Sequence, residues 1–296
     1  MTGLEFQFLI SAGQPIAGLV WDSCCPLLRV LERDGSQLLI DTSRNLTIAE
    51  DRATPAFGHV RQLEWSPCGR YVAFLREDHV DIWNTRKRKW VTSPPAWDRV
   101  ERLAWRPNPV NSEGQLSVAT PCGLILWSAE GDFDSRFPQL SSAPTALAWD
   151  PTGTWVALAC GGLHIWNART GERIVLAADA LHELAWAPNG DWLAGASAHA
   201  MFAWNIQAVL HGRLDAHRVC QMESPVSRIA FRPGGNLLAA GTIHGCVQLR
   251  RPVVAAGLLR SADLGASVTQ LAWSANGKHL AAATSCGKAY ATRVCR

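Results

Sequence analysis

One pattern is written seven times along the 296 residues of this chain, and no other sequence feature constrains the fold as strongly. Its clearest copy is LHELAWAPNGDWLAGASAHAMFAWN, residues 181–205. This copy contains three short apolar runs that alternate with period two and are separated by turn residues such as Pro188 and Gly190. Such runs are typical of β-strands and are too short for the amphipathic helices of a helical repeat.

The copies begin near residues 16, 60, 100, 144, 181, 226 and 268, so their period is about forty residues, the period of a propeller blade. The sequence therefore predicts an all-β fold. We expect a seven-bladed β-propeller of four-stranded antiparallel blades, with a single domain over residues 1–296. The first run of each copy is the expected inner strand of a blade, and it ends in an aromatic residue: Trp21, Trp65, Trp105, Trp149, Trp186, Phe231 or Trp273.

Tryptophan is the unusual residue of the composition, with fourteen in the chain. Burial of one indole removes roughly 150–250 Å² from water. Small alanines in the second run of each copy allow neighbouring blades to approach closely. We therefore predict that most tryptophans pack between blades instead of binding a ligand. Besides the inner-strand set, four tryptophans close the third run of a copy: Trp83, Trp127, Trp166 and Trp204.

A propeller has to join its first blade to its last, and the two ends of the sequence supply the means. The seventh copy stops after its third run, near Thr292. The N-terminal stretch LEFQFLIS, residues 4–11, alternates like a strand and has no partner within the first copy. We predict that residues 4–11 form the outer strand of the last blade.

The seven copies resemble the WD-repeat β-propeller family over almost the whole chain. That family ends the third strand in Trp-Asp and places Gly-His before the inner strand. Here Gly-His survives only at residues 58–59. The family's buried His–Asp–Trp hydrogen-bond network therefore has one candidate, formed by His59, Asp78 and Trp83. The Trp-Asp pair becomes Trp-Asn or Trp-Ser, at residues 83–84, 127–128, 166–167 and 204–205.

The resemblance also implies where a partner binds. In this family the turn after the second strand and the loop before each inner strand lie on one face, which usually carries the binding site. Trp97 fits no core position of the repeat and lies near Arg99, and both residue types are frequent anchors of interfaces. Packing of Trp97 on a neighbouring loop is an equal alternative. The candidate partner-binding residues are Phe57, His59, His79, Trp97, Asp98, Arg99, His199 and His244.

The same turns carry a series of cysteine and histidine residues. Zinc accepts such ligands at about 2.0–2.3 Å, so a metal site is one hypothesis. The other is that these positions favour small or turn-forming residues, because the turns of separate blades are held apart. We expect no cofactor, with zinc as the alternative. The zinc candidates are Cys122, Cys160, His199, His244 and Cys286.

Four consecutive cations, residues 86–89, occupy the predicted turn between the third and fourth strands of the second copy, on the opposite face. Such a run could meet a phosphate backbone, and it is more typical of a solvated hairpin tip. The chain's net charge of +3 gives nucleic acid little further support. The longest insertion, residues 207–217, lies on that face as well and shows no ligand spacing.

Composition and motifs limit the remaining classes. With 48% hydrophobic and 18% charged residues, the chain is typical of a globular protein. It has no apolar run of transmembrane length and no basic segment of a secretory signal at its N-terminus. Nine cysteines without a CxxC spacing favour reduced thiols and a cytoplasmic location.

The sequence contains no GxSxG or HExxH motif, no Walker loop and no dinucleotide fingerprint, which are signatures of catalysis. We therefore expect a non-catalytic scaffold or adaptor subunit. It would bind another protein or a peptide on the loop face, with no membrane and no nucleic acid as partner. A metal-linked accessory protein and a propeller enzyme are the alternatives.

Overall fold

Two compact units divide the chain in the computed structural model. The first unit comprises residues 1–57 with 187–296, and the second comprises residues 58–186. The structure describes residues 3–22, 25–34, 36–51, 60–77, 79–93, 99–107, 114–129, 133–137, 140, 142–178, 180–213, 217–234, 237–251 and 257–294.

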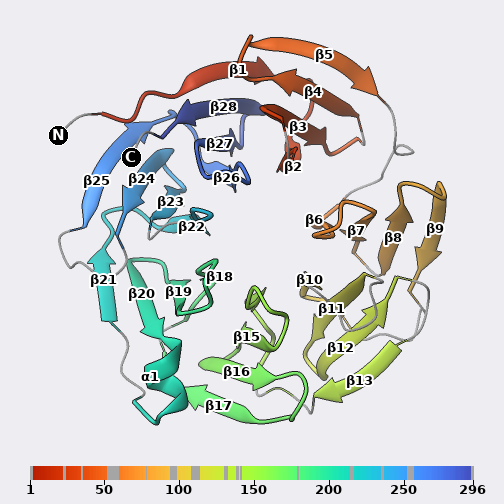
Figure 1. Ribbon diagram of the computed structural model, residues 1–296, viewed down its shortest axis with the longest axis vertical. Coiled ribbons are helices and arrows are strands. Elements are labelled where there is room, and N and C mark those ends of the chain that lie inside the picture. The colour runs from red at the N-terminus through yellow and green to blue at the C-terminus, as the bar shows by residue number, and fades with distance from the viewer. Residues whose placement is uncertain are drawn as a thin grey trace. The chain divides into compact units, whose positions relative to one another are not determined.

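The described strands form seven four-stranded antiparallel sheets, the blades of a seven-bladed β-propeller, as the repeat predicts (Figure 1). In six of these sheets the strands follow one another in chain order, because each short turn joins neighbours. The second unit holds β6 (Gln62–Trp65), β7 (Tyr71–Leu75), β8 (Val80–Asn84), β9 (Lys89–Thr92), β10 (Arg102–Arg106), β11 (Gln115–Thr120), β12 (Gly123–Ser128), β13 (Phe133–Phe137), β14 (Ala146–Trp149), β15 (Trp155–Ala159), β16 (Leu163–Asn167), β17 (Arg173–Leu176) and β18 (Glu183–Trp186).

The first unit contains the strands of the other copies and a short helix. Its complete sheets have the orders β2-β3-β4-β5, β22-β23-β24-β25 and β1-β28-β27-β26, and its strands β19, β20 and β21 follow β18 in the order β18-β19-β20-β21. Its elements are β1 (Gln7–Ser11), β2 (Ile16–Trp21), β3 (Leu27–Glu32), β4 (Gln37–Asp41), β5 (Leu46–Asp51), β19 (Trp192–Ala196), β20 (Ala200–Asn205), α1 (Ile206–Leu210), β21 (His217–Gln221), β22 (Val226–Phe231), β23 (Leu238–Thr242), β24 (Cys246–Arg250), β25 (Leu258–Asp263), β26 (Val268–Trp273), β27 (His279–Thr284) and β28 (Lys288–Arg293).

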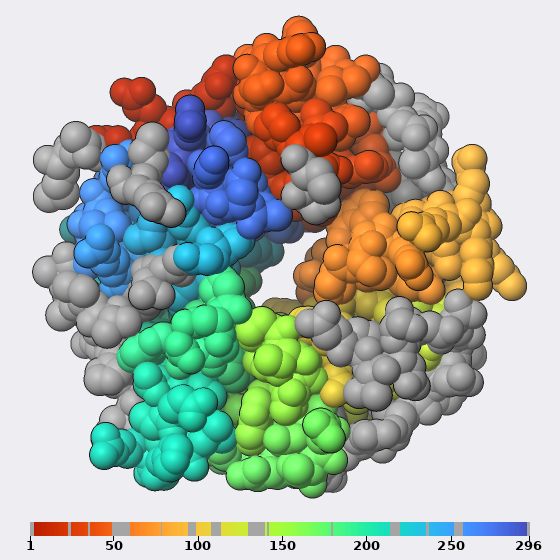
Figure 2. All heavy atoms as spheres, viewed as in Figure 1, coloured from red at the N-terminus to blue at the C-terminus, as the bar shows by residue number. Residues whose placement is uncertain are grey.

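The N-terminal strand completes the last blade, as predicted. Strand β1 pairs antiparallel with β28, with Gln7 opposite Ala291 and Ser11 opposite Lys288. In Figure 2 the red atoms of the N-terminal segment lie against the blue atoms of the C-terminal segment. The strand begins at Gln7, and the residues before it serve another purpose: the backbone N–H of Leu4 donates to the Ser261 carbonyl of β25 at 3.0 Å. The segment therefore ties the last two sheets of the first unit together.

The asparagine that replaces the family's aspartate after the third-strand tryptophan shapes the next turn. The Asn84 side-chain oxygen accepts the N–H of Arg86 at 3.1 Å and that of Lys87 at 2.8 Å. Asn167 accepts two backbone N–H groups in the same way. Asn205 accepts from Ala208 and caps α1, a helix that the sequence did not predict within the insertion. Asparagine is suited to this role because its short amide reaches the backbone two and three residues on.

Five of the six inner-strand tryptophans, all except Trp65, join neighbouring blades through their indole N–H groups. In four cases the indole donates to the carbonyl that precedes the aromatic residue of the neighbouring copy. Each such bond contributes about 1 kcal/mol in addition to the buried area. Trp149 instead donates to the hydroxyl of Ser117 at 2.8 Å. The four bonds, 2.9–3.1 Å long, are Trp21 to Ala272, Trp105 to Glu64, Trp186 to Ala148 and Trp273 to Ala230.

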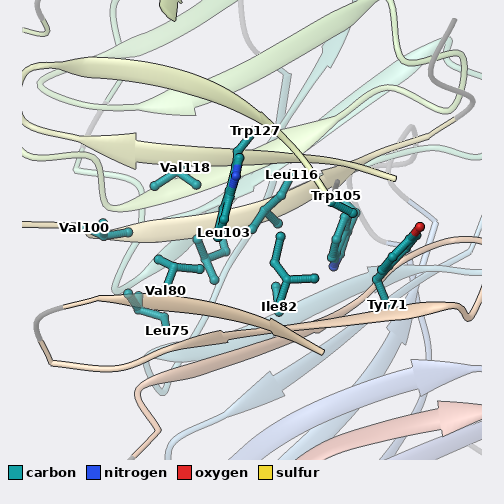
Figure 3. Close-up of a cluster of buried hydrophobic side chains, with 12 residues drawn as sticks. Tyr71, Leu75, Val80, Ile82, Val100, Leu103, Trp105, Leu116, Val118 and Trp127 are labelled. Carbon is teal, nitrogen blue, oxygen red and sulfur yellow. The ribbon is translucent and has the colours of Figure 1, made fainter. Parts of the chain in front are cut away.

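The core lies between the sheets, as the cluster between the β6–β9 and β10–β13 sheets shows (Figure 3). There the rings of Tyr71 and Trp105 stack with centroids 5.9 Å apart. Ile82 and Leu103 fill the space between the two sheets, and Trp127 is 1% exposed. The tryptophans of the repeat are therefore packing residues, as expected from their spacing.

Candidate interaction surface

Each sheet has two ends, and the candidate residues belong to one of them. One end carries the turn between the second and third strands and also the start of the inner strand. We call it the second-turn end. In the β6–β9 sheet the N–H of Arg61 donates to the Leu75 carbonyl at 2.8 Å, and the N–H of Arg76 donates to the His79 carbonyl at 2.9 Å. The antiparallel register therefore places Arg61, Arg76 and His79 at the same sheet end.

An arginine–glutamate cluster covers the second-turn end between two blades of the second unit. Glu101 precedes β10 and accepts from Arg99 Nε at 3.0 Å and from Arg61 Nη2 at 3.3 Å. Arg61 also donates through Nη1 to the Val100 carbonyl at 3.1 Å. The side chain of Arg99 is 72% exposed, whereas that of Glu101 is only 12% exposed. Arg99 is thus the member of the cluster that a partner can reach.

His79, another candidate, lies beside a buried carboxylate. Its Nε2 is 3.4 Å from Asp81 Oδ2, which also accepts from Arg76 Nε at 2.6 Å. The other oxygen of Asp81 accepts from the Thr92 hydroxyl at 2.7 Å. Asp81 is 6% exposed, so these donors supply the hydrogen bonds that water would otherwise make. His79 therefore belongs partly to the structure of the turn, and its side chain is 32% exposed.

Further polar bonds link the starts of the inner strands along this end of the second unit. Arg102 Nε donates to the Thr145 carbonyl at 2.6 Å, and the Thr145 hydroxyl donates to the Leu181 carbonyl at 2.5 Å. Gln62 exchanges two hydrogen bonds with the backbone of Leu103. These residues fix the loops relative to one another, so the surface is organised before any partner arrives.

In the first unit, His199 and His244 lie in the second turns of their own sheets, and both are exposed. The His199 carbonyl accepts the N–H of Met222 at 2.8 Å, which holds the turn against the segment after β21. His244 Nδ1 is 2.9 Å from the Ser224 hydroxyl. Each imidazole therefore stays accessible to a partner on a turn that the backbone holds in place.

The zinc candidates are placed in different environments. Cys122 and Cys286 are exposed, whereas Cys160 is 1% exposed and burial raises the pKa of its thiol. A raised pKa disfavours the thiolate that zinc binds. The Cys286 sulfur lies 3.2 Å from the Thr284 hydroxyl. Within the described ranges, no three His, Cys, Asp or Glu side chains gather where they could hold a metal ion.

A buried histidine that the sequence did not single out occupies the β14–β17 sheet. His164 is 4% exposed, and its Nε2 is 3.1 Å from the Cys160 carbonyl. Arg173 approaches the other ring nitrogen, with Nη2 at 2.7 Å and Nε at 3.2 Å from Nδ1. Guanidinium groups only donate, so Nδ1 accepts and the proton is on Nε2. Burial, followed by the charge of Arg173, lowers the pKa of His164 below its ordinary value.

Several predicted residues lie outside the described part of the chain: Phe57, His59, Trp97, Asp98 and Asp78. Of the candidate network of His59, Asp78 and Trp83, the structure describes only Trp83, in β8. Arg61, Glu101 and Asp81 belong to the candidate surface, but the sequence analysis did not predict them as site residues. The sequence carried no repeated signal for Arg61 and Glu101, because most other copies have a short residue at this position, such as Thr145, Ser227 or Thr269. Asp81 and His164 occupy the same position in their copies, VDIWN and LHIWN.

Comparison with known proteins supports the fold directly. No family model and no curated protein matches the sequence. Among solved structures, the crystal structure of the RRP9 WD40 repeats has a TM-score of 0.75 at 15% identity, covering 97% of each chain. The structure of U3-55K has a TM-score of 0.76 at 15% identity, covering 99% of this chain and 100% of that chain. The resemblance to the WD-repeat β-propellers is therefore confirmed at the level of the fold.

Among the described residues, no helix combines the length and the apolar character that crossing a membrane requires.

Proposed function

We propose that this chain is a non-catalytic scaffold that binds a protein or peptide at the second-turn ends of its blades. The arrangement around Glu101 carries the proposal. One exposed arginine, Arg99, is held by a nearly buried carboxylate that is itself fixed by Arg61. A cation held in this way loses little side-chain entropy when it meets a partner. WD40 repeat structures share the fold, which adds an analogy to this argument.

The partner we propose is another protein, with this chain as a subunit of a complex. Arg99 offers a planar guanidinium suited to a carboxylate or a backbone carbonyl. The partly exposed imidazole of His79 and the exposed imidazoles of His199 and His244 add hydrogen-bonding groups on their own sheets. We also propose a cytoplasmic location, because the cysteines of the described residues are free thiols, as expected in a reducing compartment.

Affinity capture with quantitative mass spectrometry tests the proposal. Wild type is compared with Arg99→Ala and with Trp97→Ala, a position two residues earlier in the sequence. Arg169→Ala is the matched control, because Arg169 is an exposed arginine in a turn at the opposite sheet end. We expect Arg99→Ala and Trp97→Ala to lose partners that Arg169→Ala retains. Identical partner lists for all four proteins would exclude this surface.

A further inference from the structure

The β6–β9 sheet carries a second charged feature, at the end opposite to the proposed binding surface. The turn between β8 and β9 presents Arg86, Lys87, Arg88 and Lys89 in succession, and all four are exposed. The whole chain has a net charge of only +3, so this one run exceeds the chain's excess of cations over anions.

A fifth cation is held beside the turn by the backbone. The Arg70 carbonyl accepts the N–H of Thr85 at 2.9 Å and the Thr85 hydroxyl at 3.0 Å. Arg70 ends the turn between β6 and β7, so two turns of the sheet are joined at this end. We call Arg70 with residues 86–89 the basic tip. Within the described residues, Arg70, Arg86, Arg88 and Lys89 make no ion pair with an acid.

The backbone of the tip is strained at one of these cations. Arg88 has a φ of 50°, in the left-handed region that L-residues other than asparagine and aspartate seldom occupy. The equivalent turns of two other blades place Asn45, with φ 54°, and Gly171, with φ 75°, at this position. An arginine here costs stability that glycine would not cost, and residues in such conformations cluster at functional sites.

We infer that the basic tip is a second binding surface, which takes an acidic segment of a partner protein. Three or more guanidinium and ammonium groups on one hairpin match closely spaced carboxylates, and each arginine can bind a carboxylate through two hydrogen bonds. The side chain of Asn84 fixes the turn through the N–H groups of Arg86 and Lys87, so the cations project from an ordered backbone.

The cations cover only one end of one sheet, and this small area favours a protein segment over nucleic acid as the partner. A phosphate backbone draws its affinity from cations spread along a stripe. The corresponding end of the β14–β17 sheet is mixed in charge, with Arg169 and Glu172 in one turn and Asp150 in the other. In the described part of this unit, consecutive exposed cations therefore occur on a single hairpin, which suits a short acidic peptide.

Fluorescence anisotropy with a labelled polyglutamate peptide tests the inference on the full chain. We expect saturable binding that weakens as salt is added, because exposed charges are screened. The double variant Arg86→Ala/Lys89→Ala should weaken binding by about fivefold or more, from the loss of two exposed charge pairs. Arg169→Ala, an exposed arginine on the equivalent turn, is the matched control and should bind like wild type.

Two further arms make the result decisive. Arg88→Gly removes a cation and the strain together, so we expect weaker peptide binding with an unchanged or raised melting temperature, which excludes unfolding as the cause. A labelled oligothymidine replaces the peptide in parallel. Absence of peptide binding, equal binding by the double variant and the control, or tighter binding of oligothymidine than of polyglutamate would overturn the inference.

Discussion

The β6–β9 and β14–β17 sheets follow the same sequence pattern, but each has a different buried polar side chain in its third strand. Their third strands read VDIWN and LHIWN, so Asp81 and His164 occupy the same buried position. Asp81 is an anion that receives hydrogen bonds from Arg76 and Thr92. His164 is a neutral ring that accepts from Arg173 and contacts the Cys160 carbonyl. One position of the repeat thus accommodates opposite chemistries, provided that neighbouring side chains satisfy the buried polar atoms.

The turns of these two sheets differ in the same manner. Gly69 and Gly153 occupy equivalent positions in the turns between the first and second strands, with φ of 66° and 69°. A Cβ on Gly69 would meet nothing within 4 Å, whereas a Cβ on Gly153 would overlap the Pro107 carbonyl oxygen of the neighbouring blade. The neighbouring residue, Arg106, binds the Gly153 carbonyl through Nε at 2.7 Å and lies over the Trp149 ring. Both turns therefore need a residue with positive φ. Only the turn with Gly153 also excludes a Cβ, because the next blade packs against it.

Glycine substitution gives the largest expected difference between the two sheets. Gly153→Ala should lower the free energy of unfolding by more than about 4 kcal/mol, because it combines backbone strain with overlap in a packed contact. Gly69→Ala carries the strain alone and should cost about 1 kcal/mol. Urea denaturation followed by tryptophan fluorescence measures both. Similar costs for the two variants would show that Pro107 yields and that the blade contact is not tight.

Removal of the buried carboxylate comes next in size. Asp81→Ala leaves Arg76 and Thr92 without their acceptor and should lower the free energy of unfolding by about 3 kcal/mol. Asp81→Asn keeps an acceptor for the Thr92 hydroxyl and should cost less. The same denaturation experiment applies. If Asp81→Ala proved as stable as Asp81→Asn, the hydrogen bond from the Thr92 hydroxyl would contribute nothing.

The sequence alone predicted the parts of the molecule that each copy repeats. Local pattern and period were enough to predict the packing tryptophans, the Pro-x-Gly turns and an outer strand within residues 4–11. The sheets of the structure contain these features. Asp81, His164 and the overlap at Gly153 depend on which side chains meet across strands or between blades. The partners Arg76 and Arg173 come from different elements of their sheets, so no spacing rule links them to this position. The helix α1 was missed because it is a single short segment within an insertion.

Acid should destabilise the β14–β17 sheet through His164. The folded state holds the pKa of this imidazole below its ordinary value, so the unfolded chain takes up a proton first as the pH falls. The free energy of unfolding therefore decreases below about pH 6.5, the ordinary value, and continues to decrease through the lower folded pKa. Protonation would also place an N–H of the ring against the Arg173 guanidinium.

A variant without a titrating ring isolates this effect. His164→Gln keeps an acceptor for Arg173 and a donor for the Cys160 carbonyl. Its free energy of unfolding should fall less than that of wild type between about pH 8 and about pH 5. His279, whose pKa burial and Arg293 also lower, titrates equally in both proteins and cancels from the difference. Parallel stability curves would show that His164 accepts a proton without loss of structure.

The smallest expected effect lies in the turns between the third and fourth strands, where Arg88 and Gly171 adopt the same left-handed conformation. Arg88→Gly should raise the free energy of unfolding by about 0.5–1 kcal/mol, because glycine adopts positive φ without steric cost. Gly171→Ala should lower it by about 1 kcal/mol, since a Cβ there meets no atom within 4 Å and only the backbone conformation is penalised. Thermal melts of both variants measure the pair. Loss of stability in Arg88→Gly would mean that the arginine side chain supports the hairpin, and the strain at Arg88 would then no longer point to a binding role for the basic tip.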